Sequence, residues 1–225
     1  ERGMSVIPPA IALLSQLLKN DGHKTDLFDT TFYDIEDEIA LKDADENLEK
    51  TLQVRPIQGQ ETEKKILQTI TSNPSLDLRK KILQFKPDLL AISCTETTFP
   101  RALKLVQDTR DLGIYNIFGG VFPTFAPQIV IDYKEVDSLC VGEGEKALVD
   151  LANCIAKKNK IENITNLWIK NIDGSIQKNP ITKPVDINEL PAVTDIGLFD
   201  QQRFYRPLGG KIRKVLPVET HRGCP

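Results

Sequence analysis

Hydrophobic residues near the start of the chain recur with the period of an amphipathic helix. They follow Pro8-Pro9, which suits the first helical turn, and Gly22 stands where a helix commonly ends. We therefore predict a helix over about residues 9–21 and a short strand over Thr25–Asp29. The apolar positions of this helix are Ile11, Leu13, Leu14, Leu17 and Leu18.

Short, almost wholly apolar runs occur at 89–93, 114–118 and 138–141, as expected for strands covered on both faces of a sheet. Helical patterns lie between and after them, at 101–112, more weakly at 125–133, and at 146–157. Alternation of this kind produces right-handed crossover connections. We predict an α/β fold, a Rossmann-like (flavodoxin-like) doubly wound parallel sheet.

Three other segments do not follow this alternation of strands and helices. Residues about 30–76 are polar and charged and indicate an insertion, partly helical over 61–71. Asn171-Ile172-Asp173-Gly174 predicts a tight turn, and hence a β-hairpin over 166–179. Residues 180–225 are proline-rich and indicate an extended linker, so we expect a domain over 1–165, the hairpin, and then the linker.

Composition narrows the class of protein. The chain has 225 residues, a formal net charge of −3 and 40% hydrophobic residues, which suit a soluble globular domain. The chain has no overall positive charge that would attract a nucleic-acid backbone. It also has no apolar run long enough to span a bilayer and no signal-peptide pattern. We therefore expect a cytoplasmic protein that binds neither nucleic acid nor membrane. Its four cysteines are too widely spaced for a disulfide framework or a closed metal site.

In an open parallel sheet, ligands bind beyond the carboxyl ends of the strands. We therefore predict a ligand edge formed by loops 93–98, 119–124 and 141–145. The first loop is rich in hydroxyls, the second has paired glycines and the third is a glycine-flanked acidic turn. Helix capping or plain turns would also explain each of them. None matches a dinucleotide fingerprint or a Walker-type sequence.

Several segments, taken in order, resemble the cobalamin-binding radical S-adenosylmethionine (SAM) family. The resemblance covers nearly the whole chain apart from about 30–76. In that family a Rossmann-like domain carries cobalamin, and a proline-rich linker leads to a barrel that binds a [4Fe-4S] cluster and SAM. The segments are Pro8-Pro9, Gly22-His23, Pro87–Ser93, Gly119–Thr124, Asp137–Glu145 and the terminal Arg222-Gly223-Cys224-Pro225.

The resemblance implies which residues line the cobalamin groove. It also implies that Cys224 is the first cysteine of a Cys-x3-Cys-x2-Cys cluster motif whose other members lie beyond Pro225. Alone, Cys224 cannot hold a cluster. The expected groove residues are Ser93, Thr95, Glu96, Gly119, Gly120, Val121, Thr124, Gly142, Glu143 and Gly144.

Histidine ligation of cobalt is not expected. Asp21-Gly22-His23 superficially resembles the Asp-x-His-x-x-Gly motif of some cobalamin carriers, but Asp26 replaces the glycine and His23 follows the first helix instead of leading it. His23 is better interpreted as a solvated turn residue. Cys94, Cys140 and Cys154 are interpreted as small buried apolar residues.

The resemblance implies a parent enzyme that cleaves SAM reductively and methylates an unactivated carbon of a small-molecule or peptide substrate. This segment would supply the cobalamin pocket. The alternative is a non-catalytic, flavodoxin-like sensor or binding module. Against a phospho-receiver, the strand ends lack the expected acidic cluster and distant lysine. Absorbance after mixing with hydroxocobalamin distinguishes the two hypotheses.

Overall fold

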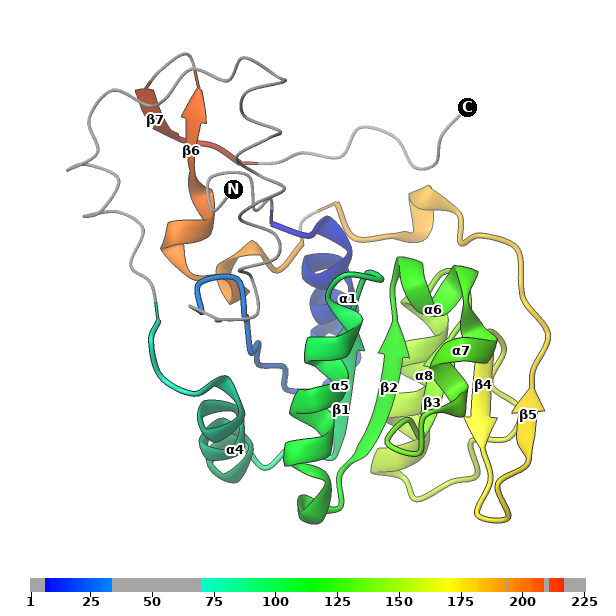
Figure 1. The fold of residues 1–225 in the computed structure, drawn as a ribbon. Coiled ribbons are helices and arrows are strands. Elements are labelled where there is room, and N and C mark those ends of the chain that lie inside the picture. The colour runs from blue at the N-terminus through cyan, green and yellow to red at the C-terminus, as the bar shows by residue number, and fades with distance from the viewer. Residues whose placement is uncertain (1–6, 34–69, 193, 209–210, 217–225) are drawn as a thin grey trace, which may run out of the picture. The chain divides into compact units, whose positions relative to one another are not determined.

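The computed structural model describes residues 7–33, 70–192, 194–208 and 211–216. They belong to two compact units, one formed by 10–26 and 75–195 and the other by described parts of 1–9, 27–74 and 196–225. Figure 1 shows the elements of both units, which we describe separately. No helix in the described ranges is both long and apolar enough to cross a membrane.

The larger unit contains a five-stranded sheet in the order β1-β2-β3-β4-β5. The first three strands are parallel, and β4 and β5 join the far side as an antiparallel hairpin. Gly174 in the turn has φ +82°, as the Asp-Gly pattern predicted. The strands are β1 (Leu89–Ser93), β2 (Tyr115–Gly119), β3 (Ser138–Cys140), β4 (Leu167–Lys170) and β5 (Ile176–Lys178).

Helices cover both faces of this sheet (Figure 1). Alternate strand residues face opposite ways, so Phe118 and Leu139 pack with α5 and α7, whereas Ile117 and Cys140 pack with α1 and α8. The predicted α/β class, a mostly parallel and open sheet, is therefore confirmed. The helices are α1 (Pro9–Asn20), α4 (Pro74–Phe85), α5 (Phe99–Asp108), η3 (Arg110–Leu112), α6 (Val121–Phe125), α7 (Pro127–Asp132) and α8 (Glu145–Ala156).

Three local predictions need correction. Residues 25–29 are not a strand, because in the described chain no ladder pairs with them; Thr25 instead contacts Ser15 and Asp26 pairs with Lys81 at 2.8 Å. The helix expected over 125–133 is the shorter α7, which begins at Pro127, and sequence reasoning missed the separate short helix α6 that ends at Phe125. Sequence reasoning missed α4, although Pro74 and Asp77 suit its first turn.

The predicted insertion helix over 61–71 falls mostly outside the described residues. Residues 180–195 belong to the larger unit and include the short 3₁₀ helix η4 (Ile187–Glu189). The predicted domain limits stay a prediction.

The described residues of the smaller unit include two 3₁₀ helices and a β-hairpin. Its described core residues include Phe32, Tyr33, Phe199 and Phe204. Arg203 lies 3.0 Å from Asp29, and Tyr33 forms a single parallel bridge with Ile70. The elements are η5 (Ile196–Leu198), η6 (Gln201–Phe204), β6 (Tyr205–Leu208) and β7 (Lys211–Lys214), so this part of the predicted linker carries regular structure.

A buried amide joins β2 to β3 at the amino end of the sheet. Asn116 is fully buried; its Nδ2 donates to the carbonyl of Glu135 at 2.9 Å and to Asp137 Oδ2 at 2.8 Å, and its Oδ1 accepts from Asp137 N at 3.1 Å. Asn116→Ala leaves these partners without their amide and is expected to lower the free energy of unfolding by about 2 kcal/mol. Urea denaturation measures the loss. An equal loss for the exposed Asn163→Ala would contradict the role assigned to this amide.

Candidate functional site

The three predicted loops meet at the carboxyl edge of the parallel strands. The backbone N–H of Cys94 donates to the carbonyl of Gly119 at 3.0 Å, and that of Phe122 donates to the carbonyl of Cys94 at 3.4 Å. The N–H of Gly142 donates to Thr124 Oγ1 at 3.1 Å, which ties the second segment to the third. The structure therefore brings all three segments to one edge. Val121 and Thr124 lie on α6 and not in a loop, because α6 begins directly after Gly120.

Gly120 is required by the packing of the first two segments. Its φ of +98° and ψ of −164° suit glycine alone. A Cβ there would lie 2.9 Å from the carbonyl oxygen and 3.2 Å from the nitrogen of Cys94. From the sequence, both glycines were predicted to let a ligand come close to the backbone. For Gly120 the structure shows a different reason, the approach of the chain to itself.

Gly119 borders open space instead. Among the described residues, a Cβ at Gly119 would have only the Ile92 carbonyl oxygen, at 4.0 Å, as a neighbour. Ser93 pairs with Gly119 and Ala91 with Ile117, so these residues share the face covered further down by α1 and α8. Ala91 and Ser93 are both exposed. The carboxyl ends of β1 and β2 thus form a small-residue surface, defined by Ala91, Ser93 and Gly119, on which a ligand can approach the sheet closely.

The hydroxyls of the first segment bond largely within it. Thr95 N donates to Thr98 Oγ1 at 2.9 Å, and Thr95 Oγ1 lies 3.1 Å from the hydroxyls of both Thr97 and Thr98. These contacts shape the turn before α5. The same side chains and that of Glu96 are exposed, so they also remain accessible to a ligand.

The acidic turn is directed toward the chain that follows the hairpin. Glu143 Oε2 accepts from the backbone N–H of Val185 at 2.9 Å, and the carbonyl of Glu143 accepts from Asn166 Nδ2 at 2.9 Å. Gly142 has φ +87°, and a Cβ at Gly144 would lie 3.7 Å from Leu14 on α1. Sequence reasoning missed the contact with Val185, since no local pattern reports a bond across 42 residues.

Two buried cysteines flank the edge without offering thiolates. Burial raises the pKa of the Cys94 thiol to about 11. Burial, assisted by the charge of Glu145, raises that of Cys140 to about 12. Both thiols are therefore protonated near neutral pH, which supports their interpretation as small buried residues. Within the described ranges no group of His, Cys, Asp and Glu is arranged to hold a metal ion, and Cys224 lies outside those ranges.

His23 lies away from the three segments. It follows α1, 3.7 Å from Asp21, and Asp21 accepts from Asn153 Nδ2 at 2.5 Å. Asn153 belongs to the last turns of α8, whereas the acidic turn leads into the first. This position agrees with the interpretation of His23 as a residue beside a turn, but the expected solvated side chain is wrong, because it is half-buried and its Nε2 is shielded from solvent. His221 lies outside the described residues.

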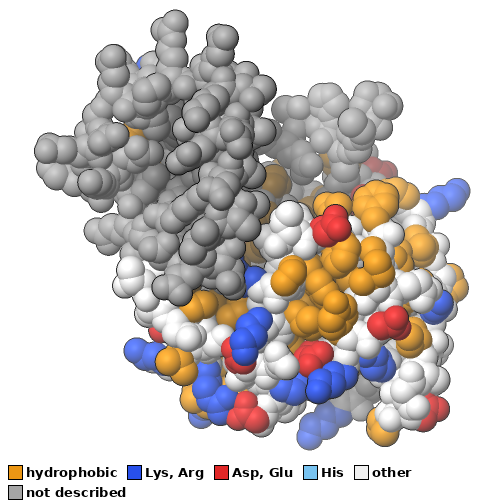
Figure 2. Space-filling view, in the orientation of Figure 1, with side chains coloured by type: hydrophobic (Ala, Val, Ile, Leu, Met, Phe, Trp, Pro, Cys, Tyr) orange, Lys and Arg blue, Asp and Glu red, His pale blue; other side chains and the backbone are white. Residues whose placement is uncertain are grey.

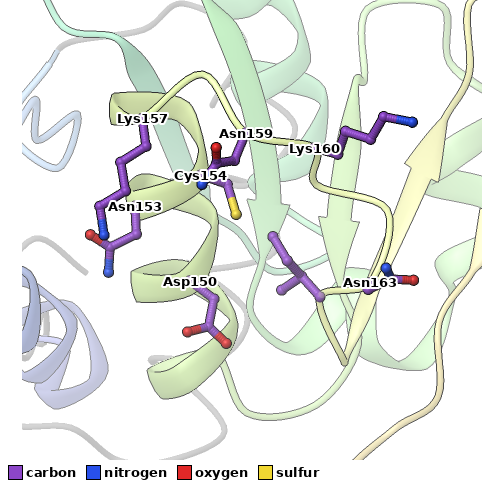
Figure 3. Close-up of a pocket in the computed structure, with 8 residues that line it drawn as sticks. Asp150, Asn153, Cys154, Lys157, Asn159, Lys160 and Asn163 are labelled. Carbon is purple, nitrogen blue, oxygen red and sulfur yellow. The ribbon is translucent and has the colours of Figure 1, made fainter.

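A hollow of about 350 Å³ occupies the far end of α8 (Figure 3). Polar and charged side chains, including Asp150 and Lys157, line it together with Ile164 and the thiol of Cys154. Cys154 is nine residues along α8 from Glu145, or about 14 Å at 1.5 Å per residue. The hollow is therefore separate from the strand-end segments.

Apolar side chains gather on the surface over α6 and α7 (Figure 2). Val121, Phe125 and Ile129 are 61%, 84% and 55% exposed and are spaced by four residues. This row starts at the carboxyl edge of the sheet. Val121 therefore stands at the margin of the candidate site with an accessible side chain.

Residues 59–152 match the family model of the B12-binding domain. The chain carries a B12-binding domain. The match includes all three segments at the carboxyl edge, while residues 59–69 lie outside the described part of the structure. The family resemblance predicted cobalamin as the cofactor, and this match confirms that prediction for the domain.

Two curated proteins resemble the chain over most of its length. The anaerobic magnesium-protoporphyrin IX monomethyl ester cyclase of Rubrivivax gelatinosus is 25% identical over 66% of this chain and 27% of that protein. The 4'-phospho-dehydrooxetanocin synthase of Priestia megaterium is 22% identical over 64% of this chain and 19% of that protein. The chain therefore spans less than a third of the relatives that it matches.

A solved structure shares the fold. The radical SAM methyltransferase TsrM from Kitasatospora setae superposes with a TM-score of 0.55 and 16% identity, over 80% of this chain and 29% of that chain. The fold described above therefore has a counterpart in a known larger structure.

Proposed function

We propose that the B12-binding domain holds cobalamin across the three segments at its carboxyl edge. The observation that carries the proposal is the coincidence of the family match with the surface formed by Ala91, Ser93 and Gly119. This surface fits the cofactor because it lacks bulky side chains where a large group must approach the backbone. Exposed Val121 adds apolar contact at the margin.

The proposed contacts divide by chemistry. Ser93, Thr95 and Thr124 offer hydroxyls to amide or phosphate groups, and Gly119 leaves room beside the sheet. Glu96 is exposed at the same edge. Glu143 acts through the chain that it holds, and Gly142 and Gly144 shape the turn. When bound, cobalamin supplies organometallic methyl transfer, while the protein contributes position and exclusion of water.

We further propose that the whole protein is a cobalamin-dependent radical SAM enzyme that methylates an unactivated carbon. The likeness to the two curated enzymes and to a radical SAM methyltransferase supports this proposal. Cys224 would then be the first of three cysteines that hold a [4Fe-4S] cluster, with SAM bound beside it. A small-molecule or peptide substrate would be selected mainly by regions outside this chain.

Titration with hydroxocobalamin tests the first proposal. After gel filtration, the protein fraction should retain about one equivalent of cobalamin by absorbance. Absence of retained cobalamin at micromolar protein would overturn it. For the second proposal, the full-length protein with a reconstituted cluster should cleave SAM under reducing conditions. Cobalamin retention without SAM cleavage would favour the alternative, a non-catalytic binding module.

His23→Ala is expected to leave cobalamin affinity within about twofold of the parent value. The reason is its position beside Asp21 and α8, away from the carboxyl edge. The visible spectrum of bound hydroxocobalamin should also stay the same, because no imidazole of this residue is lost from cobalt. A spectral shift together with a large loss of affinity would show that His23 is a cobalt ligand.

A further inference from the structure

Residues 180–192, which we name the strap, are fixed at one end to the acidic turn. Asn166 N donates to the carbonyl of Pro180 at 2.9 Å, and Thr182 N donates to Asn166 Oδ1 at 2.7 Å. Val185 N donates to Glu143 Oε2 at 2.9 Å. Ile181 Cγ2 would lie 3.9 Å from a Cβ at Gly142. The strap therefore begins directly on the third segment of the candidate site.

A second polar anchor follows the strap, at Asp195. Its backbone N–H donates to the carbonyl of Ala12 at 3.1 Å, and its carboxylate accepts from Ser15 Oγ and pairs with Lys19, both at 2.6 Å. Burial acts to raise the pKa of Asp195, but the bonds from Lys19 and Ser15 outweigh it, and the net pKa is lowered. An ionised carboxylate thus joins the chain to α1.

The first anchor is on the acidic turn itself, and the second is on α1, which touches that turn. Glu143 belongs to the turn, and α1 touches it through Leu14, which lies 3.7 Å from a Cβ at Gly144. In Figure 1 the chain leaves β5, passes along the edge where β2 ends and reaches α1. The strap therefore spans the carboxyl edge of the sheet instead of trailing from the hairpin.

The middle of the strap is shaped by local contacts. Asp186 Oδ1 accepts from the backbone and side-chain nitrogens of Asn188 at 2.9 and 2.8 Å, which forms the turn of η4. Ile187 is 54% exposed, and Asp186, Asn188 and Glu189 are exposed as well. This preformed turn places one apolar and three polar side chains in solvent near the candidate site.

We propose that the strap is a retaining wall for cobalamin, with Glu143 and Asp195 as the positioning residues that keep it across the ligand edge. The inference rests on the proposed cobalamin function. Ile187 offers apolar contact to the macrocycle, and the polar side chains of η4 match the amide groups on its rim. Release of cobalamin then requires the strap to leave its anchors.

Release kinetics test the proposal in the full-length protein. Loaded with hydroxocobalamin, Glu143→Ala and Asp195→Ala are expected to release it about tenfold faster than the parent, because each loses a charge-assisted anchor. Glu143→Gln keeps an oxygen that can accept from Val185 and should stay close to the parent. Glu162→Ala, an exposed carboxylate paired only at 3.7 Å with Lys160, is the control.

Protease protection gives an independent readout. Cobalamin should slow Glu-specific cleavage after Glu189 in the parent protein, and protect much less in Glu143→Ala. If Glu143→Ala does not fold by circular dichroism, Val185→Pro, which removes the donating N–H while also fixing the local φ and leaving Glu143 unchanged, replaces it in both assays. Parent protein that retains no cobalamin refutes the proposed function. Retention with unchanged release rates and no protection refutes the strap alone.

Discussion

Gly119→Leu should weaken cobalamin binding by about ten- to a hundredfold while leaving the fold intact. A leucine side chain would occupy the open space over Ala91 and Ser93, where a closely packed ligand tolerates few added methylenes. The fold should tolerate it, because the one neighbour of the new Cβ in the described part of the chain is the Ile92 carbonyl oxygen at 4.0 Å. Hydroxocobalamin titration gives the affinity, and thermal unfolding of the apoprotein gives the stability.

Gly197→Leu is the matched control for this change. A Cβ at Gly197 meets no atom of the described residues within 4 Å, and the residue lies on η5, outside the larger unit. The change adds the same leucine at a position that is not among the residues of the candidate site. Equal affinities of the two variants would show that cobalamin does not approach the sheet at Gly119.

Gly120→Ala should lower the free energy of unfolding by about 3 kcal/mol. Alanine is strained at φ +98° and ψ −164°, and its Cβ would lie 2.9 Å from the backbone oxygen of Cys94, which cannot move without disturbing β1. Urea denaturation followed by circular dichroism measures the change. Gly119→Ala, one residue earlier, is the control and should cost less than about 1 kcal/mol.

Variants of the two glycines therefore distinguish an effect on folding, expected at Gly120, from an effect on cobalamin binding, expected at Gly119. If Gly120→Ala is as stable as the parent yet loses cobalamin, then the ligand and not Cys94 requires this glycine. If both alanine variants are equally destabilised, the assignment of open space to Gly119 is wrong.

Local pattern was sufficient for most elements of the larger unit. Apolar runs located β1 to the residue, and β2 and β3 to within one residue, because a strand covered on both faces has nearly every position apolar. The turn at 171–174 was equally readable, because Gly174 needs a positive φ. The strand expected at 25–29 failed for the opposite reason. Strand residues become a strand only with a partner, and pattern does not report one.

The candidate site divides in the same way. Its three segments were predictable, since parallel strands end at one edge and connecting segments must follow them. The different roles of the paired glycines were not predictable, because Gly120 meets the backbone of Cys94 while Gly119 meets open space. The position of Glu143 was not predictable either, because its partner Val185 lies in the segment predicted to be a linker.

Sequence alone was therefore enough for the α/β class, the meeting of the three segments at one edge and the cobalamin family, since each follows from short-range periodicity or motif order. Only the tertiary structure decided which glycine serves the fold, that Ala91 joins Ser93 and Gly119 in one surface, and that Glu143 and Asp195 fix the strap. These depend on contacts between residues far apart in the chain. Such contacts form when the whole sheet and its helices pack, and no local pattern encodes them.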